Sequence, residues 1–133
     1  MAETTEFELV TPERLVFSER AEMVVVPGSE GLFAAMPRHA PFLSTLRPGV
    51  LEVYEGGKVK QRIFVAGGFA EVTPERLTVL AERAVPVGDI DRAAVEQRIK
   101  NLRDDLASAK TDVEKKDVEE ALAAAQAELL AAA

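Results

Sequence analysis

The sequence predicts an α+β protein, with an N-terminal antiparallel β-sandwich followed by a C-terminal antiparallel two-helix hairpin. All 8 Gly, all 7 Pro and all 6 Phe lie at or before residue 88. Up to that point turn signals recur about every 8–12 residues, which is typical of a sandwich. Beyond it, apolar residues recur at spacings of three and four, which is typical of helices. We therefore predict a sandwich domain over residues 1–88 and a helical hairpin domain over residues 89–133.

Composition excludes several classes of protein. The chain has 133 residues, of which 47% are hydrophobic, and a net charge of −7. It suffices for one ordinary domain or two very small ones, and it is too apolar for a disordered protein. A pI of about 4.8 argues against a nucleic-acid partner. The acidic start does not resemble a signal peptide, and no uncharged run approaches the roughly 20 residues of a membrane span.

The first strands are predicted by alternation and by turn residues. Residues 6–10 alternate polar and apolar, as a half-buried strand does. The segment 10–15, Val-Thr-Pro-Glu-Arg-Leu, recurs letter for letter at 72–77, and its proline favours a turn. We interpret the two copies as one kind of turn used twice. Residues 23–26 are continuously apolar, which predicts a strand covered on both faces.

The remaining strands centre on a hairpin. Residues 50–54 and 59–65 flank Gly56 and Gly57, which can adopt positive φ in a tight turn. A second pair, Gly67 and Gly68, allows a close backbone approach. That approach is explained equally well by a bulge in the sheet and by a partner.

The last 45 residues predict two helices. Asp89 or Asp91 can cap the first, and Thr111 begins a capping box for the second. The apolar stripes are Val95, Ile99, Leu102, Leu106 and Ala109, then Val118, Leu122, Ala125, Leu129 and Ala132. Alanine favours each helix but buries little surface, so we expect modest packing between them. No Gly or Pro separates the stripes, so one long helix is also compatible with the sequence.

No group of residues indicates catalysis or a metal site. His39 is the only histidine and there is no cysteine, so a metal site would lack ligands. We expect His39 to order a loop by hydrogen bonding. Gly28 and Gly31 lack the Lys-Ser/Thr ending of a phosphate-binding loop and predict a turn instead. Taken together, the residues favour a docking or regulatory subunit that needs no cofactor.

Several blocks in register resemble a known family. Residues 27–31, 36–41, 46–50, 65–72 and 79–82 are similar, in order and spacing, to the epsilon subunit of bacterial F-type ATP synthase. The mitochondrial delta subunit is its counterpart. The resemblance implies a non-catalytic central-stalk subunit whose sandwich binds the gamma subunit and the c-subunit ring. It would lie at the cytoplasmic face of the bacterial plasma membrane and couple proton-driven rotation to ATP synthesis.

The resemblance also assigns partner-binding residues. Those expected to face the c-ring or gamma are Gly28, Ser29, Glu30, Gly31, Leu32 and His39. Leu32 replaces an acidic or polar residue of many members. Arg38 replaces a glycine, and positive φ costs a non-glycine residue about 1–2 kcal/mol, so we expect the loop to differ locally.

For the helices, the resemblance implies regulation. They can extend along gamma, reach the alpha and beta subunits and inhibit ATP hydrolysis; the alternative is an ATP-sensing hairpin. Ile90 and Asp91 match the family's nucleotide-binding motif, but Arg92 comes two residues early, a rotation of roughly 200° on a helix. No basic residue follows Lys116. We therefore expect weak or absent ATP binding and modest inhibition.

Overall fold

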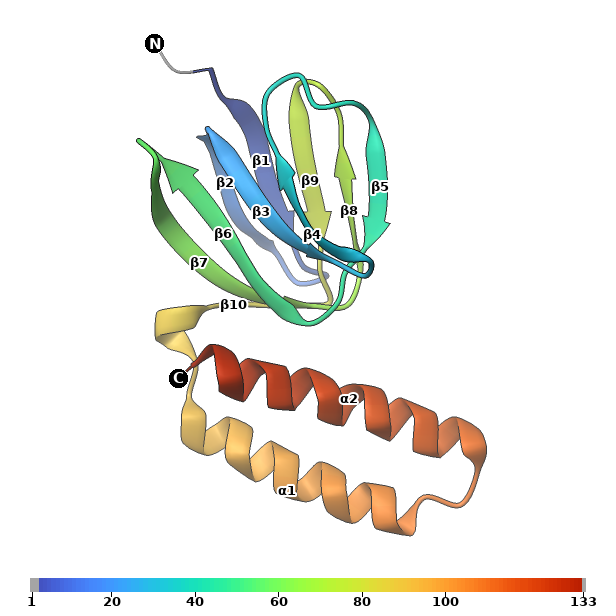
Figure 1. The fold of residues 1–133 in the computed structure, drawn as a ribbon. Coiled ribbons are helices and arrows are strands. Elements are labelled where there is room, and N and C mark those ends of the chain that lie inside the picture. Colours follow the sequence, from blue (N-terminus) through green and yellow to red (C-terminus); the bar gives the residue numbers. More distant parts are fainter. Residues whose placement is uncertain (1–2, 133) are drawn as a thin grey trace. The chain divides into compact units, whose positions relative to one another are not determined.

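The computed structural model describes residues 3–132, and its contacts divide the chain into two units, residues 1–86 and 87–133. The first unit is a sandwich of two five-stranded sheets, and the second is a pair of helices (Figure 1). The predicted fold class is confirmed. No helix in the described part of the chain is long and apolar enough to cross a membrane.

Ten strands build the sandwich. They are β1 (Thr5–Val10), β2 (Leu15–Ala21), β3 (Met23–Gly28), β4 (Gly31–Ala35), β5 (Phe42–Thr45), β6 (Gly49–Glu55), β7 (Lys58–Ala66), β8 (Phe69–Val72), β9 (Arg76–Leu80) and β10 (Arg83–Pro86). Sheet A has the order β2-β1-β9-β8-β5, and sheet B has the order β10-β7-β6-β3-β4. Neighbours pair antiparallel except β1 and β9, which run parallel with Glu6 opposite Arg76.

The repeated segment forms the same turn twice, as predicted. After β1, the Thr11 N–H donates to the Arg14 carbonyl at 3.0 Å. Before β9, the Thr73 N–H donates to the Arg76 carbonyl at 2.8 Å. One turn therefore ends β1 and the other begins its parallel neighbour β9.

The core lies between the two sheets. Along β1, Phe7 and Leu9 are fully buried while Glu6 and Glu8 are not, which confirms the predicted alternation. The expectation that residues 23–26 form a strand covered on both faces is wrong. Only Val24 and Val26 are fully buried there, because each sheet of a sandwich turns one face to the core.

The structure decides between the two explanations of the second glycine pair. Gly67 and Gly68 have φ of 73° and 89°, values that disfavour other residues. A Cβ built on Gly68 would lie 1.8 Å from the Leu80 carbonyl oxygen. The close backbone approach is therefore to this protein's own strand β9.

The second unit is the predicted hairpin. A 3₁₀ turn, η1 (Val87–Asp89), leads into α1 (Arg92–Ser108), which Asp91 caps, and α2 (Asp112–Ala131) follows, capped by Thr111. Ala109 has extended backbone angles, φ −66° and ψ 134°, so the helices do not fuse. Val95, Ile99 and Ala125 are buried, with Ile90, Leu102, Leu122 and Leu129 packed around them. Of the alanines in the predicted stripes only Ala125 belongs to this cluster, and larger apolar side chains make the rest of the contact.

Candidate functional site

The β3–β4 turn, which carries five of the predicted partner-binding residues, is fixed against sheet A. Gly28 pairs with Gly31 across the turn, leaving Ser29 and Glu30 exposed at its tip. The Ser29 N–H donates to the Thr45 carbonyl at 2.9 Å, and the Thr45 hydroxyl donates to the Ser29 hydroxyl at 2.8 Å. A Cβ on Gly28 would meet the Gly31 carbonyl oxygen and the Ser44 hydroxyl at 2.9 Å. Hydrogen bonds to β5 and close packing around Gly28 therefore fix the conformation of the turn.

His39 joins this region through aromatic contacts. Its ring centroid lies 6.4 Å from that of Phe42, which in turn lies edge-on to Phe33 at 5.1 Å. The His39 Nδ1 lies 2.6 Å from the Ala40 carbonyl oxygen, a hydrogen bond in which Nδ1 carries the proton. His39 thus orders its loop, as the residues predicted, and it stands on the same side of the sandwich as β4 and β5.

The preceding residue, Arg38, corrects one expectation. Arg38 has φ of 63°, so it keeps the left-handed conformation that a glycine would adopt, and the expected local difference is wrong. Its N–H donates to the Pro74 carbonyl at 2.8 Å, and its guanidinium pairs with Glu3. The His39 N–H closes the turn onto the Met36 carbonyl at 3.2 Å. These bonds hold the backbone in spite of the side chain.

Beside the turn lies an apolar groove of about 650 Å³. Ser29 and Glu30 form one wall, and Phe42, Leu43 and Phe69 form much of the rest. These three apolar side chains are 45%, 64% and 41% exposed. Exposed aromatic and leucine side chains gathered in one place are typical of a surface that a partner covers.

The exposed apolar residues continue across the outer face of sheet A. Strand register places the exposed Leu15, Leu80 and Phe69 in one row with Val10, which is half-buried and lies between Leu15 and Leu80. Leu15 is 56% exposed and Leu80 is 37% exposed. We call this set the apolar row. It meets the groove at Phe69, so the two surfaces are continuous.

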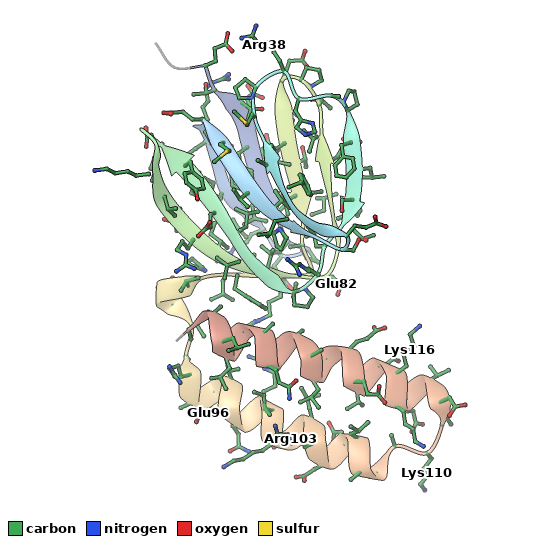
Figure 2. The ribbon with its side chains drawn as sticks, viewed as in Figure 1. Arg38, Glu82, Glu96, Arg103, Lys110 and Lys116 are labelled. Carbon is green, nitrogen blue, oxygen red and sulfur yellow. The ribbon has the colours of Figure 1, made fainter. Side chains whose placement is uncertain are left out.

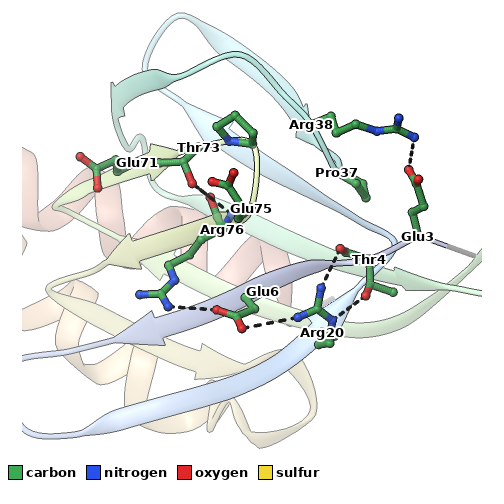
Figure 3. A pocket seen from close by; sticks show the side chains of 11 residues that line it. Glu3, Thr4, Glu6, Arg20, Pro37, Arg38, Glu71, Thr73, Glu75 and Arg76 are labelled. Atoms are coloured by element: carbon green, nitrogen blue, oxygen red, sulfur yellow. Dashed lines mark hydrogen bonds and ion pairs between the residues drawn. The ribbon is translucent and has the colours of Figure 1, made fainter.

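The opposite end of the same face is charged. Arg20, Glu6 and Arg76 stand on β2, β1 and β9, with ion-pair distances of 3.4 Å and 3.0 Å to Glu6 (Figure 3). They line a polar pocket of about 1040 Å³. Exposed pairs of this kind contribute little stability. The outer face of sheet A therefore has an apolar end and a charged end whose side chains pair with one another.

The residues of the nucleotide motif have structural contacts in the hairpin. The Asp91 carboxylate accepts from the Ala94 N–H at 3.1 Å, which caps α1. Ile90 packs against the hairpin core. Arg92 lies on the wall of a groove with Lys100 and Arg103. Among residues 3–132, no cluster of three side chains could hold a metal ion.

Comparison with known proteins identifies the family. Residues 4–87 match the family model "ATP synthase, Delta/Epsilon chain, beta-sandwich domain", and residues 91–133 match the model of the C-terminal domain of the ATP synthase epsilon chain. The ATP synthase epsilon chain of Rhodospirillum rubrum is 60% identical over 132 residues, covering 99% of this chain and 98% of that protein. That of Paramagnetospirillum magneticum is 50% identical, covering 96% and 100%.

The chain belongs to the ATP synthase epsilon chain family. The resemblance found in the sequence is confirmed, and the protein is a non-catalytic subunit of ATP synthase.

Solved structures share the epsilon-chain fold. A subunit of the Euglena gracilis mitochondrial ATP synthase, in an OSCP/F1/c-ring structure, aligns with a TM-score of 0.75 and 24% identity, covering 93% of this chain and 78% of that subunit. One from the Tetrahymena thermophila mitochondrial ATP synthase central stalk and c-ring aligns with 0.65 and 15%, covering 98% of each.

Two features of this epsilon-family protein escaped the sequence reasoning. Phe42, Leu43 and Phe69 look like core residues of strands, but all three are exposed, Phe42 and Leu43 on the edge strand β5 and Phe69 on its neighbour β8. Glu128 was not singled out from the sequence, but it is 1% exposed and lies 3.2 Å from the Arg98 guanidinium. Its position three residues after the buried Ala125 could have shown that it lies at the helix contact.

Proposed function

We propose that this protein is the central-stalk subunit that joins the gamma subunit to the c-subunit ring. It would act at the cytoplasmic face of the bacterial plasma membrane and transmit proton-driven rotation to ATP synthesis. The observation that carries the proposal is the continuous exposed apolar surface formed by the groove and the apolar row. Family membership supports it, as do the F1/c-ring and central-stalk/c-ring assemblies of its structural relatives.

The β3–β4 turn and the groove beside it are the proposed contact with the ring. The turn is rigid because Ser29 is hydrogen-bonded to Thr45 on the other sheet. Leu32 next to it is 62% exposed, so this member would meet the ring with an apolar side chain. A turn that is already rigid binds a partner without first losing conformational freedom.

The apolar row is the proposed contact with gamma. Leu15, Leu80 and Phe69 project from three different strands of one sheet. A sheet face presents its side chains at fixed spacing, which suits docking onto another rigid body. Because Phe69 belongs to both the groove and the apolar row, the contact with the ring and the contact with gamma would be adjacent. A subunit that lies between gamma and the ring requires such an arrangement.

The hairpin is the proposed regulatory element, with a modest effect. Only Val95, Ile99 and Ala125 are buried between the helices, so separating the helices exposes far fewer core side chains than opening the sandwich would. If α2 extended to the alpha and beta subunits, all of its charged side chains after Lys116 would be acidic. We therefore favour weak inhibition. We do not favour ATP sensing, because Asp91 caps its own helix and Ala94 stands where the motif requires arginine.

Co-purification with gamma tests the docking face. Leu80→Glu places a charge in the middle of the apolar row, while Val113→Glu changes an equally apolar side chain that is 70% exposed on α2. We expect tagged gamma to retain the wild-type protein and Val113→Glu but to lose Leu80→Glu. Circular dichroism would confirm that both variants fold. Equal retention of the two folded variants would refute the apolar row as the gamma contact.

A further inference from the structure

The hairpin carries a groove that the stalk function does not use. Its volume is about 740 Å³, and it runs between α1 and α2. Ile99 and Leu129 belong to the hairpin core and form its floor. Leu130 forms the α2 side and is 77% exposed, the largest exposed fraction among the large apolar residues described.

The α1 side of this groove is basic. Three basic residues line it: Arg92, then Lys100 eight residues later and Arg103 eleven residues later. These spacings place them on one face of α1 over about 16 Å. Within residues 3–132 none of the three has an ion-pair partner. Glu96 stands between the first two and leaves the wall with an excess of positive charge. Figure 2 shows Glu96 and Arg103 along α1.

This basic wall contrasts with the sandwich strands of the same protein. The chain has a net charge of −7, and most cations described on the sandwich strands are paired with glutamates. On α1, Arg98 is paired with Glu128. Unpaired cations along one lip, opposite an exposed leucine on the other, form an amphipathic surface.

We infer that the hairpin groove binds an acidic amphipathic helix of a protein partner. The apolar floor and Leu130 would receive leucine-type side chains spaced at three and four residues, as grooves that bind helices do. The basic wall would pair with carboxylates along one edge of that helix. Arg92 lies about 12 Å along the helix from Lys100, so the cations form a line that suits the edge of a helix better than the compact phosphates of a nucleoside triphosphate. The inference is independent of the proposed docking to gamma and the c-ring.

Fluorescence anisotropy with the full-length protein tests the groove. The probe is a labelled 20-residue helical peptide with leucines on one face and glutamates along its edges; a second peptide carries lysines instead. We expect the acidic peptide to bind and the lysine peptide not to bind. Binding of the acidic peptide should weaken as salt is added, because exposed charge pairs are screened. Leu130→Ala should also weaken it.

Two triple variants with the same change in charge locate the contact. Arg92→Gln/Lys100→Gln/Arg103→Gln removes the basic wall. Lys110→Gln/Lys115→Gln/Lys116→Gln removes three cations from the helix connection and the start of α2, where Figure 2 labels Lys110 and Lys116. We expect the first to weaken binding about tenfold or more and the second to change it little. Circular dichroism would confirm that both hairpins fold.

Three outcomes would overturn the inference. One is no binding of the acidic peptide by the wild-type protein. Another is equal loss of binding in the two folded triple variants, which would indicate general electrostatic attraction. The third is displacement of the peptide from the wild-type groove by ATP, which would make the groove a nucleotide site. None of these outcomes affects docking of the sandwich to gamma.

Discussion

Replacing Gly68 by alanine should destabilise the sandwich more than the same change at a glycine where only backbone strain applies. Gly68 has φ of 89°, which costs alanine about 1–2 kcal/mol. Its new Cβ would also lie 1.8 Å from the Leu80 carbonyl oxygen and 2.8 Å from the carbonyl carbon. Strand β9 would have to move, and overpacking of this kind adds about 1–3 kcal/mol. The two effects together give about 2–5 kcal/mol.

Gly56→Ala is the matched control. Gly56 has φ of 62° in the β6–β7 turn, and no atom lies within 4 Å of a Cβ built there. Only the strain of about 1–2 kcal/mol applies. The difference between the two variants therefore isolates the collision with β9.

Urea unfolding followed by the β-sheet circular dichroism signal measures both variants. We expect Gly68→Ala to lose clearly more free energy of unfolding than Gly56→Ala, with an unchanged slope against urea. Equal losses would refute the reasoning, because they would mean that Gly68 does not approach β9. The glycine pair would then require another explanation, such as a partner.

Three further predictions concern charge, strain and the hairpin. Hydrogen bonds from Lys60 to Glu19 and then Glu55, at 2.5 Å and 3.0 Å, raise the pKa of Lys60 above its ordinary 10.5. A raised pKa stabilises the fold while Lys60 is protonated, and this contribution is lost as pH rises through the pKa of Lys60 in the folded protein. The gap between the urea midpoints of wild type and Lys60→Met should therefore narrow as pH rises through the pKa of Lys60; a constant gap would contradict this. Arg38→Gly should be more stable than Arg38→Ala by about 0.5–1 kcal/mol in urea unfolding. Both variants lose the ion pair with Glu3, but only alanine keeps the strain of positive φ. The greater freedom of glycine in the unfolded chain offsets part of that gain. Deleting residues 89–133 should change ATP hydrolysis by the assembled enzyme only modestly; strong activation would show that the hairpin inhibits strongly.

Local patterns predicted most of the fold. Alternation at 6–10, the repeated proline turn and the helix caps at Asp91 and Thr111 depend on neighbouring residues, and the structure has them. Local patterns could not predict that only one face of residues 23–26 is buried. A continuous apolar run does not show whether other elements pack on one face of the strand or on both. The separation of α1 from α2 depends on the backbone of Ala109, and alanine has no preference for ending a helix.

The candidate site was less accessible to such reasoning. The resemblance located the turn at Gly28–Leu32, and the structure adds Phe42 and Phe69 to its neighbourhood. Their exposure depends on where β5 and β8 lie in sheet A, with β5 at its edge, and no local pattern encodes the order of strands in a sheet. Arg38 is a different case. The preference of arginine for negative φ predicted a changed loop, but Arg38 has positive φ, and hydrogen bonds of the loop backbone hold it there.

Cross-linking in the assembled enzyme tests the docking of the sandwich most directly. The protein has no cysteine, so Ser29→Cys and Lys58→Cys each provide its only thiol. Ser29 lies at the tip of the β3–β4 turn, and Lys58 follows the β6–β7 turn. With a photoreactive maleimide on either thiol, the account predicts that Ser29→Cys forms a product with the c-subunit and that Lys58→Cys does not. A ring product from Lys58→Cys alone would contradict it.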